Sequence, residues 1–238
     1  MSQQQPTHPD IHRLSKKDTT ERMLMASTFV LLLLVADQAI KFAVKLNMML
    51  GESIQVTDWF YIYFTENPGM AFGWEVFSKG FLTVFRIVAS LYLAYLLWKV
   101  ASRSYGVGFL GCIAAILAGA VGNIIDSIFY GQIFSHSTGQ VATLFPSDGG
   151  YAGWLHGKVV DMLYFPIINT TWPTWVPWVG GDEWVFFQPI FNFADACISV
   201  GVICLLLFYS HSFSALLNTP HRHQEPSAHR EPPTDEAI

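Results

Sequence analysis

The sequence has few charged residues and lacks the features that soluble or secreted domains use for stability. Only 13% of its 238 residues are charged and 52% are hydrophobic, whereas about a quarter of an ordinary soluble domain is charged. The net charge of −5 gives no basic excess for nucleic acid. Three cysteines, all within apolar runs, cannot form a disulfide framework. The composition argues against a water-soluble globule and excludes a nucleic-acid partner.

Long apolar stretches make up much of the sequence. Four of them approach the roughly 20 helical residues that cross a hydrocarbon core of about 30 Å: Met23–Val44, Phe81–Trp98, Val107–Ile128 and Phe191–Phe213. The first could be a cleaved signal peptide, but no small-x-small cleavage site follows it and its helical pattern continues past Asp37. The sequence therefore predicts an all-α membrane protein with four transmembrane helices.

The distribution of Lys and Arg predicts the orientation. Eight of them lie in the two terminal tails and the turn between the second and third spans, and three lie in the remaining loops. By the positive-inside rule both termini are cytoplasmic, and residues 46–80 and 129–190 face the outside. The polar tails, 1–22 and 214–238, are predicted to be disordered because they cannot bury enough apolar surface. Residues 23–213 form the membrane domain.

The two outer segments carry unusual sequence. Residues 51–75 include the β-branched and aromatic run Ser53–Phe64, which predicts one or two strands of a small outer sheet. This sheet is either an interfacial anchor or a platform that cradles a membrane-borne substrate. Outer loop 129–190 contains a polar, Gly-rich stretch, 133–157, and a stretch with four tryptophans, 169–188. The second stretch is typical of an interfacial loop.

Several carboxylates lie within or beside the predicted spans, where a charged side chain costs free energy. Asn123 and Asp126 lie one helical turn apart, and Asn192 and Asp195 repeat that spacing. Asp161 has apolar neighbours in the sequence. We expect the three carboxylates to meet at one membrane depth.

A site with several carboxylates permits different chemistries. Two carboxyls in a partly dry site share one proton, so one can activate water while the other polarises a carbonyl, as in an aspartic peptidase. A divalent-metal site, an ion or proton pathway in a small transporter and purely structural pairing are alternatives. A non-catalytic assembly protein that binds a partner through its tryptophan-rich loop is a weaker one. The residues alone leave these open.

Five motifs, taken together and in order, resemble those of the lipoprotein signal peptidase (signal peptidase II) family. They are Asp37-x-x-x-Lys41, Asn67-x-Gly69-x-Ala71-Phe72, Gly122-Asn123-x-x-Asp126, Gly157-x-Val159-Val160-Asp161 and Phe191-Asn192-x-Ala194-Asp195. The resemblance implies an aspartic endopeptidase of the bacterial inner membrane. Such an enzyme removes the signal peptide of diacylglyceryl-modified prolipoproteins, cutting immediately before the lipid-bearing cysteine.

The resemblance also implies residue roles. Asp161 and Asp195 correspond to the catalytic pair. The supporting residues would hold the substrate or the pair, brace the helices or allow close approach: Asn67, Asn123, Asn192, Asp126, Asp37, Lys41, Gly69 and Gly122. The expected enzyme uses no metal or cofactor and acts as a monomer on membrane-embedded substrates, with its active site near the outer face.

Two departures from the family pattern stand out. The family follows its Gly-Asn-x-x-Asp motif with arginine, whereas this chain has Ser127. Any bidentate or charge-neutralising role of that arginine is therefore absent or passes to another residue such as Arg86. Asp126 and Asp161 are also 35 positions apart, farther than in the family. The inserted residues lie in outer loops, which tolerate length changes, so we expect them to change the substrate entrance rather than the catalytic pair.

Overall fold

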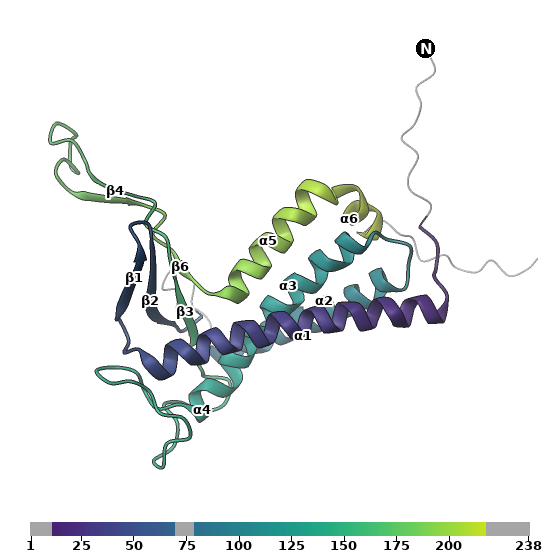
Figure 1. The fold of residues 1–238 in the computed structure, drawn as a ribbon, viewed down its shortest axis with the longest axis horizontal. Coiled ribbons are helices and arrows are strands. Elements are labelled where there is room, and N and C mark those ends of the chain that lie inside the picture. Colours follow the sequence, from purple (N-terminus) through teal and green to yellow (C-terminus); the bar gives the residue numbers. More distant parts are fainter. Residues whose placement is uncertain (1–10, 70–78, 218–238) are drawn as a thin grey trace, which may run out of the picture.

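The computed structural model describes residues 11–69 and 79–217. A bundle of helices occupies one end of the molecule and two small sheets the other (Figure 1). Residues 70–75 of the expected outer strand segment, including the motif residues Ala71 and Phe72, lie outside the described ranges. The helices are α1 (Lys16–Asn47), α2 (Lys79–Ala101), α3 (Val107–Ile125), the π-helical turn η2 (Asp126–Tyr130), α4 (Gly131–Ile133), α5 (Phe193–Phe208) and α6 (Ser210–Leu217).

Within the described ranges, three helical stretches are long and apolar enough to cross a membrane: Lys16–Asn47, Gly80–Ala101 and Val107–Ile133. The predicted fourth span, Phe191–Phe213, is wrong as a single helix, because α5 and α6 meet at an angle of 92° and qualify only as a bent pair. The bend at Tyr209 turns α6 back so that Leu216 is buried in the core of the bundle. Burial of this apolar side chain favours the turn over a continued helix.

The first helix begins earlier than the sequence predicts. Ser15 caps α1 by accepting a hydrogen bond from the amide of Asp18, a standard helix start. Residues 16–22, expected to be disordered, are therefore helical, and α6 likewise extends to Leu217. Ahead of the cap, the amide of Leu14 donates to the carbonyl of Ser102, which joins this segment to the turn between α2 and α3.

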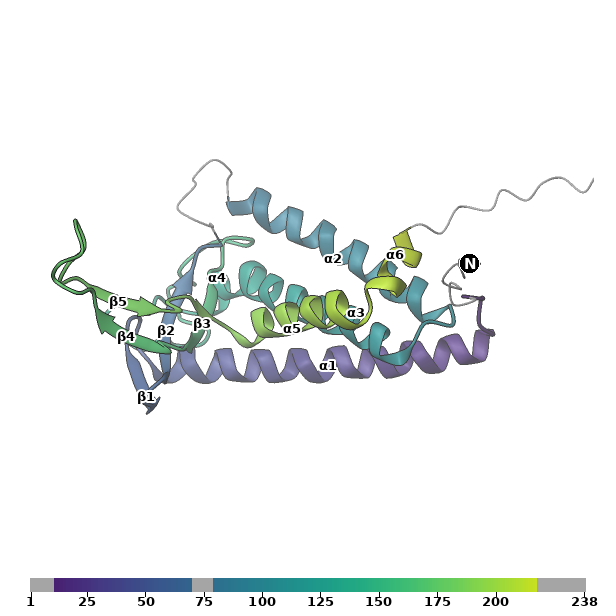
Figure 2. The ribbon, with the colours of Figure 1, turned by 90° about the horizontal axis from the view of Figure 1, so that it is seen from above.

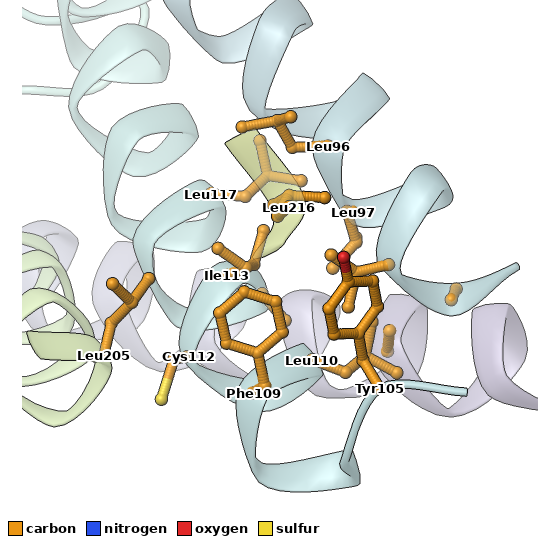
Figure 3. Close-up of a cluster of buried hydrophobic side chains, with 14 residues drawn as sticks. Leu96, Leu97, Tyr105, Phe109, Leu110, Cys112, Ile113, Leu117, Leu205 and Leu216 are labelled. Atoms are coloured by element: carbon orange, nitrogen blue, oxygen red, sulfur yellow. The ribbon is translucent and has the colours of Figure 1, made fainter. Parts of the chain in front are cut away.

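The bundle packs around α3, which contacts α1, α2 and α5. Its buried core is drawn in Figure 3 and includes Phe109, Ile113 and Leu117 of α3. Gly119 allows α5 to approach closely, because a Cβ at this position would lie 2.2 Å from the carbonyl oxygen of Ala194. This close approach brings the start of α5 beside the end of α3.

The expected strands are present, and further strands join them. Antiparallel pairing gives one sheet in the order β1-β2-β3-β6 and a separate hairpin of β4 and β5 (Figures 1 and 2). The run Ser53–Phe64 does contain strand residues, as predicted, but the strands within 129–190 were not expected. The strands are β1 (Ser53–Thr57), β2 (Phe60–Asn67), β3 (Val159–Tyr164), β4 (Ile168–Thr171), β5 (Glu183–Phe186) and β6 (Ile190–Phe191). The fold is therefore helical with small sheets rather than all-α.

Candidate active site

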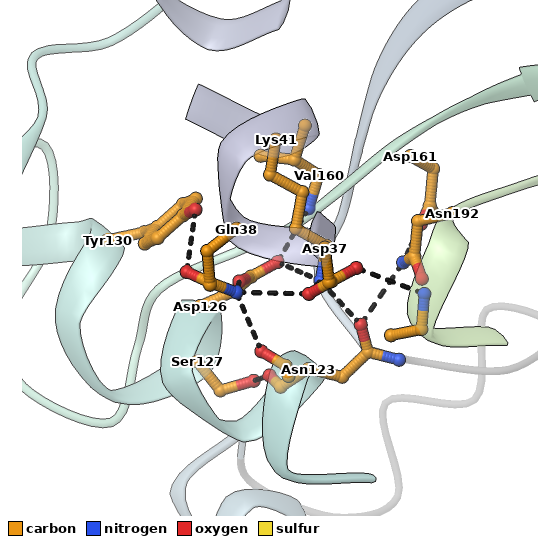
Figure 4. A network of polar contacts seen from close by, with 12 residues as sticks. Asp37, Gln38, Lys41, Asn123, Asp126, Ser127, Tyr130, Val160, Asp161 and Asn192 are labelled. Atoms are coloured by element: carbon orange, nitrogen blue, oxygen red, sulfur yellow. Dashed lines mark hydrogen bonds and ion pairs between the residues drawn. The ribbon is translucent and has the colours of Figure 1, made fainter. Parts of the chain in front are cut away.

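A polar network forms where the helices meet the four-stranded sheet (Figure 4). Its side chains come from α1, from the end of α3 and η2, from β3 and from the start of α5. The network includes all three carboxylates that the sequence predicted to meet: Asp126, Asp161 and Asp195. Their convergence is confirmed.

Two asparagines connect Asp161 and Asp195. Asn192 Nδ2 donates to Asp161 Oδ1 at 2.6 Å and to Asn123 Oδ1 at 3.1 Å. Asn123 Nδ2 in turn donates to Asp195 Oδ1 at 2.8 Å. The side chain of Asn67 also makes a hydrogen bond with Asp161. All three asparagines therefore lie where they can orient the two carboxyl groups.

Local sequence explains how α5 presents Asp195. Asn192 is the N-cap of α5, and its Oδ1 accepts from the amide of Asp195 at 2.9 Å. Asp195 Oδ2 accepts in return from the amide of Asn192 at 3.4 Å, which completes a capping box. The spacing of three residues noted in the sequence thus serves the helix start, where a negative charge is favourable.

Burial distinguishes the two aspartates. Asp161 on β3 is only 3% exposed, whereas Asp195 is half-buried. Burial, together with the nearby charge of Asp195, raises the pKa of Asp161 to about 7, although hydrogen bonds from Asn192 and Asn67 act in the opposite direction. Asp161 therefore retains a proton to a much higher pH than an ordinary aspartate does.

The predicted pair of Asp37 and Lys41 is present and extends to a third group. Lys41 Nζ lies 3.0 Å from Asp37 Oδ2 and 2.9 Å from Asp126 Oδ2, and all three side chains are at most 2% exposed. Lys41 also donates to Asn123 Oδ1 at 2.8 Å. One buried ammonium thus neutralises two carboxylates and holds an asparagine that contacts Asp195.

The two structural carboxylates also bind backbone groups of the elements that carry the pair. Asp126 Oδ2 accepts from the amide of Val160 on β3 at 3.2 Å. Asp37 Oδ1 accepts from the amide of Ala194 on α5 at 3.0 Å. Each of these carboxylates therefore fixes the residue immediately before one of the two candidate catalytic aspartates.

Gln38 belongs to the network although it was not predicted to. Its Nε2 donates to Asp37 Oδ2 at 3.0 Å and to Asp126 Oδ1 at 3.1 Å, and its Oε1 accepts from the hydroxyl of Tyr130 at 3.1 Å. The available signal was an amide within an apolar span, directly after Asp37. Gly122, which was predicted to permit close approach, does so: a Cβ there would lie 2.6 Å from Asp37 Oδ2.

Arg86 lies at the edge of the network. Its Nη1 is 3.4 Å from the hydroxyl of Ser127, the residue that replaces the family's arginine. Gly69, with φ at +83°, packs against the same guanidinium, since a Cβ on it would lie 3.2 Å from Nη1. Among the described residues Arg86 forms no ion pair within 4.0 Å, but its charge acts on Asp195 and Asp161. It can therefore supply positive charge near Ser127.

Helices long and apolar enough to cross a membrane, together with two aspartates joined by asparagines, indicate a membrane-embedded enzyme. Comparison with known proteins gives the family. The family described as Signal peptidase (SPase) II matches residues 29–211, so the chain belongs to this family and is a peptidase. The resemblance seen in the five motifs is confirmed, and the transporter alternative has no support.

Relatives cover most of the chain. A lipoprotein signal peptidase of Porphyromonas gingivalis is 56% identical over 195 residues, which is 82% of this chain and 86% of the relative. Another, from Amoebophilus asiaticus, is 37% identical over 185 residues, covering 74% of each chain. A solved bacterial membrane enzyme shares the fold, with a TM-score of 0.53 and 22% identity over 86% of this chain and 94% of the other. The chain is a membrane protein.

Proposed function

We propose that this chain is an aspartic endopeptidase that removes the signal peptide of diacylglyceryl-modified prolipoproteins, cutting immediately before the lipid-bearing cysteine. The observation that carries the proposal is the linkage of Asp161 and Asp195 through Asn192 and Asn123. Membership of the signal peptidase II family and relatives named lipoprotein signal peptidase supply the substrate class.

The two aspartates have different roles in the proposed reaction. Asp161, whose pKa is raised to about 7, is the protonated partner and donates to the oxygen of the scissile carbonyl. Asp195 is the ionised partner and takes a proton from the attacking water. The water oxygen bonds to the carbonyl carbon to form a tetrahedral intermediate. Breakdown of that intermediate breaks the C–N bond, the proton held by Asp195 passes to the leaving nitrogen, and one hydroxyl of the intermediate returns a proton to Asp161 as the new carboxyl group forms.

The asparagines keep the two carboxyl groups in the geometry that this reaction needs. Asn123 receives a hydrogen bond from Lys41 and gives one to Asp195, so its orientation is fixed from both ends. Asn192 is fixed in the same way by the capping box. Such preorganisation lowers the barrier because few groups must reorient during the reaction. The reaction as proposed uses no metal or organic cofactor.

An aromatic surface on the sheet fits a membrane-borne substrate. Phe165 stacks on Phe60 with ring centroids 4.7 Å apart and lies 5.6 Å from the ring of Phe191. Trp59, 54% exposed, also stacks on Phe165, with ring centroids 6.1 Å apart. Phe191 immediately precedes Asn192, so this surface leads to the catalytic pair. We place the aromatic surface and the catalytic pair at the outer face of the bacterial inner membrane. In this proposal both termini are cytoplasmic, and the chain acts as a monomer.

Cleavage of a diacylglyceryl-modified prolipoprotein peptide by the purified protein in detergent, with EDTA present, tests the proposal. We expect one cut, before the modified cysteine, identified by the mass of both products. The same peptide without the diacylglyceryl group is the matched control and should be cut much more slowly. Failure of a folded wild-type protein to cut the modified peptide, or inhibition by EDTA, would contradict the proposal.

A further inference from the structure

A second buried charge cluster lies on the opposite face of the sheet from the catalytic aspartate. In the β2–β3 register, Thr65 faces Asp161 and Glu66 faces Val160. Directly paired residues share a face and successive residues alternate between faces. Glu66 therefore points away from Asp161, although it lies on the adjoining strand.

Two lysines and a serine bind Glu66. Lys45 Nζ lies 2.5 Å from Glu66 Oε1, and Lys158 Nζ lies 2.9 Å from Oε2. Lys45 also donates to the hydroxyl of Ser137 at 2.9 Å, and this hydroxyl is 3.4 Å from Glu66 Oε1. The side chains of Lys45 and Glu66 are 0% and 4% exposed. A buried carboxylate with two cations is therefore shared by four segments of the chain.

These segments are the outer end of α1, β2, the start of β3 and the first insertion, defined as residues 133–157. Tyr151 of that insertion places its ring 4.9 Å from Lys45 Nζ and 5.6 Å from Lys158 Nζ. Its hydroxyl also accepts from the amide of Lys158 at 2.8 Å. Lys158 stands three residues before Asp161, so both its backbone and its side chain are held by this cluster.

We propose that Glu66 is a positioning residue for the peptidase reaction: by binding Lys45, Lys158 and Ser137 it fixes the start of β3, and with it Asp161. The inference rests on the proposed function. It also explains why the first insertion can be long without disturbing the catalytic pair, since Ser137 and Tyr151 attach it to the back of the sheet.

The charge of Glu66 is maintained at neutral pH. Burial opposes ionisation, but the hydrogen bonds and charges of Lys45 and Lys158 outweigh it and lower the pKa of Glu66. Loss of this negative charge would leave two uncompensated cations behind β3. This additional positive charge would favour the ionised form of Asp161. The other charged groups that act on Asp161 are Asp195 on α5, Lys41 on α1 and Arg86 on α2.

Glu66→Gln tests the proposal, because it removes the charge and keeps the shape. We expect kcat to fall about tenfold with little change in KM, since small misplacement of a catalytic group is costly. The alkaline limb of the pH–rate profile should move to lower pH by about 0.5. Glu183→Gln, an equivalent change at an exposed position of β5, is the matched control and should leave both unchanged.

Lys158 provides an independent variant in case Glu66→Gln folds poorly. Lys158→Gln alone removes one cation, so the alkaline limb should move to higher pH. In the double variant Glu66→Gln/Lys158→Gln the net charge of the cluster returns to its wild-type value. The alkaline limb of the pH–rate profile should therefore return to its wild-type position. A purely structural role would give no such opposite shifts and no rescue, and that result would overturn the proposal.

Hydrogen exchange separates this inference from the proposed function. The backbone amides of β3 should exchange faster in Glu66→Gln than in wild type or Glu183→Gln, whether or not the protein cuts the peptide. Unchanged exchange in β3 would overturn the proposal even if the wild-type protein is an active peptidase. Faster exchange in a protein that cuts nothing would contradict only the proposed function.

Discussion

The two insertions of the outer segment differ in how they attach to the rest of the molecule. The first insertion is joined to the sheet and helices through buried groups: Ser137 binds Lys45, and Gly150 packs so closely that a Cβ would lie 2.0 Å from the carbonyl oxygen of Gly131. The second insertion, residues 169–188, is built around a hairpin whose strands β4 and β5 pair only with each other among the described strands. It projects from the sheet, away from the end of α1 (Figure 1).

The hairpin is ordered by contacts within itself. Trp172 and Trp184 place their rings 5.8 Å apart across it. At its tip the amide of Gly181 donates to the carbonyl of Trp172, while Trp175 and Trp178 are 80% and 98% exposed. The length of an insertion therefore does not by itself show how it is attached to the site. The first insertion contacts the residues that hold the site together. The second insertion pairs only with itself among the described strands, so we expect the geometry of the site not to depend on it.

The largest effect is expected from Lys41→Met, which leaves Asp37 and Asp126 buried without their cation. Removal of one partner from a buried ion pair costs about 3–5 kcal/mol of folding free energy. We expect the stability against unfolding in detergent to fall accordingly, and activity to fall as well because Asn123 loses one of its two hydrogen-bond donors. A change in unfolding free energy below about 0.5 kcal/mol, the size of an ordinary surface change, would refute the framework described for the site.

Glycine substitutions in the first insertion give a matched pair. Gly150→Ala forces a Cβ into the backbone of Gly131, whereas a Cβ at Gly153 would meet nothing within 4 Å. We expect the first change to destabilise the protein by about 1–3 kcal/mol and the second to have little effect. Equal stability of both variants in thermal unfolding would mean that the insertion is not attached as described.

The pH dependence of cleavage reports on the proton of Asp161. Because its pKa is raised to about 7 and the protonated form is the proposed acid, kcat/KM should fall as pH rises above 7. The fall should approach about tenfold per pH unit. A rate that rises through pH 7 would instead assign Asp161 as the base. The variant Trp175→Ser/Trp178→Ser, at the tip of the hairpin, should show the same pH profile as wild type.

The smallest effect is expected at the tip of the hairpin. The double variant Trp175→Ser/Trp178→Ser removes two exposed side chains and should change kcat on a detergent-solubilised peptide by less than about twofold, as expected for surface positions away from the site. A tenfold loss would show that the second insertion contributes to the site, and the contrast between the insertions would then fail.

The sequence predicted much of the site and less of the fold. Asp37 and Lys41 are four residues apart on a helix, so their pairing follows from local geometry. The two aspartates of the proposed catalytic pair were predicted from the family motifs. The binding of Glu66 by Lys158 could not be predicted, because the two residues are 92 positions apart and meet only through strand pairing.

The fold prediction failed where tertiary packing overrides local pattern. Ser210, His211 and Ser212 interrupt the apolar run of the fourth span directly after Tyr209, but these polar residues do not by themselves give the 92° angle between α5 and α6. The strands within 129–190 are short, and β3 is buried, which makes its apolar run ambiguous between strand and helix. Gln38 was missed because a single uncharged amide in an apolar span carries little signal.

In the proposed reaction Asp161 and Asp195 perform the chemistry while other groups hold the substrate. The most direct test of this assignment measures binding and turnover of the modified prolipoprotein peptide by wild type, Asp161→Asn and Asp195→Asn, with Asp148→Asn in the first insertion as the control. We predict that both dyad variants bind the peptide about as tightly as wild type and lose about 10²–10⁴-fold in kcat. Turnover at the wild-type rate by either dyad variant would contradict the account.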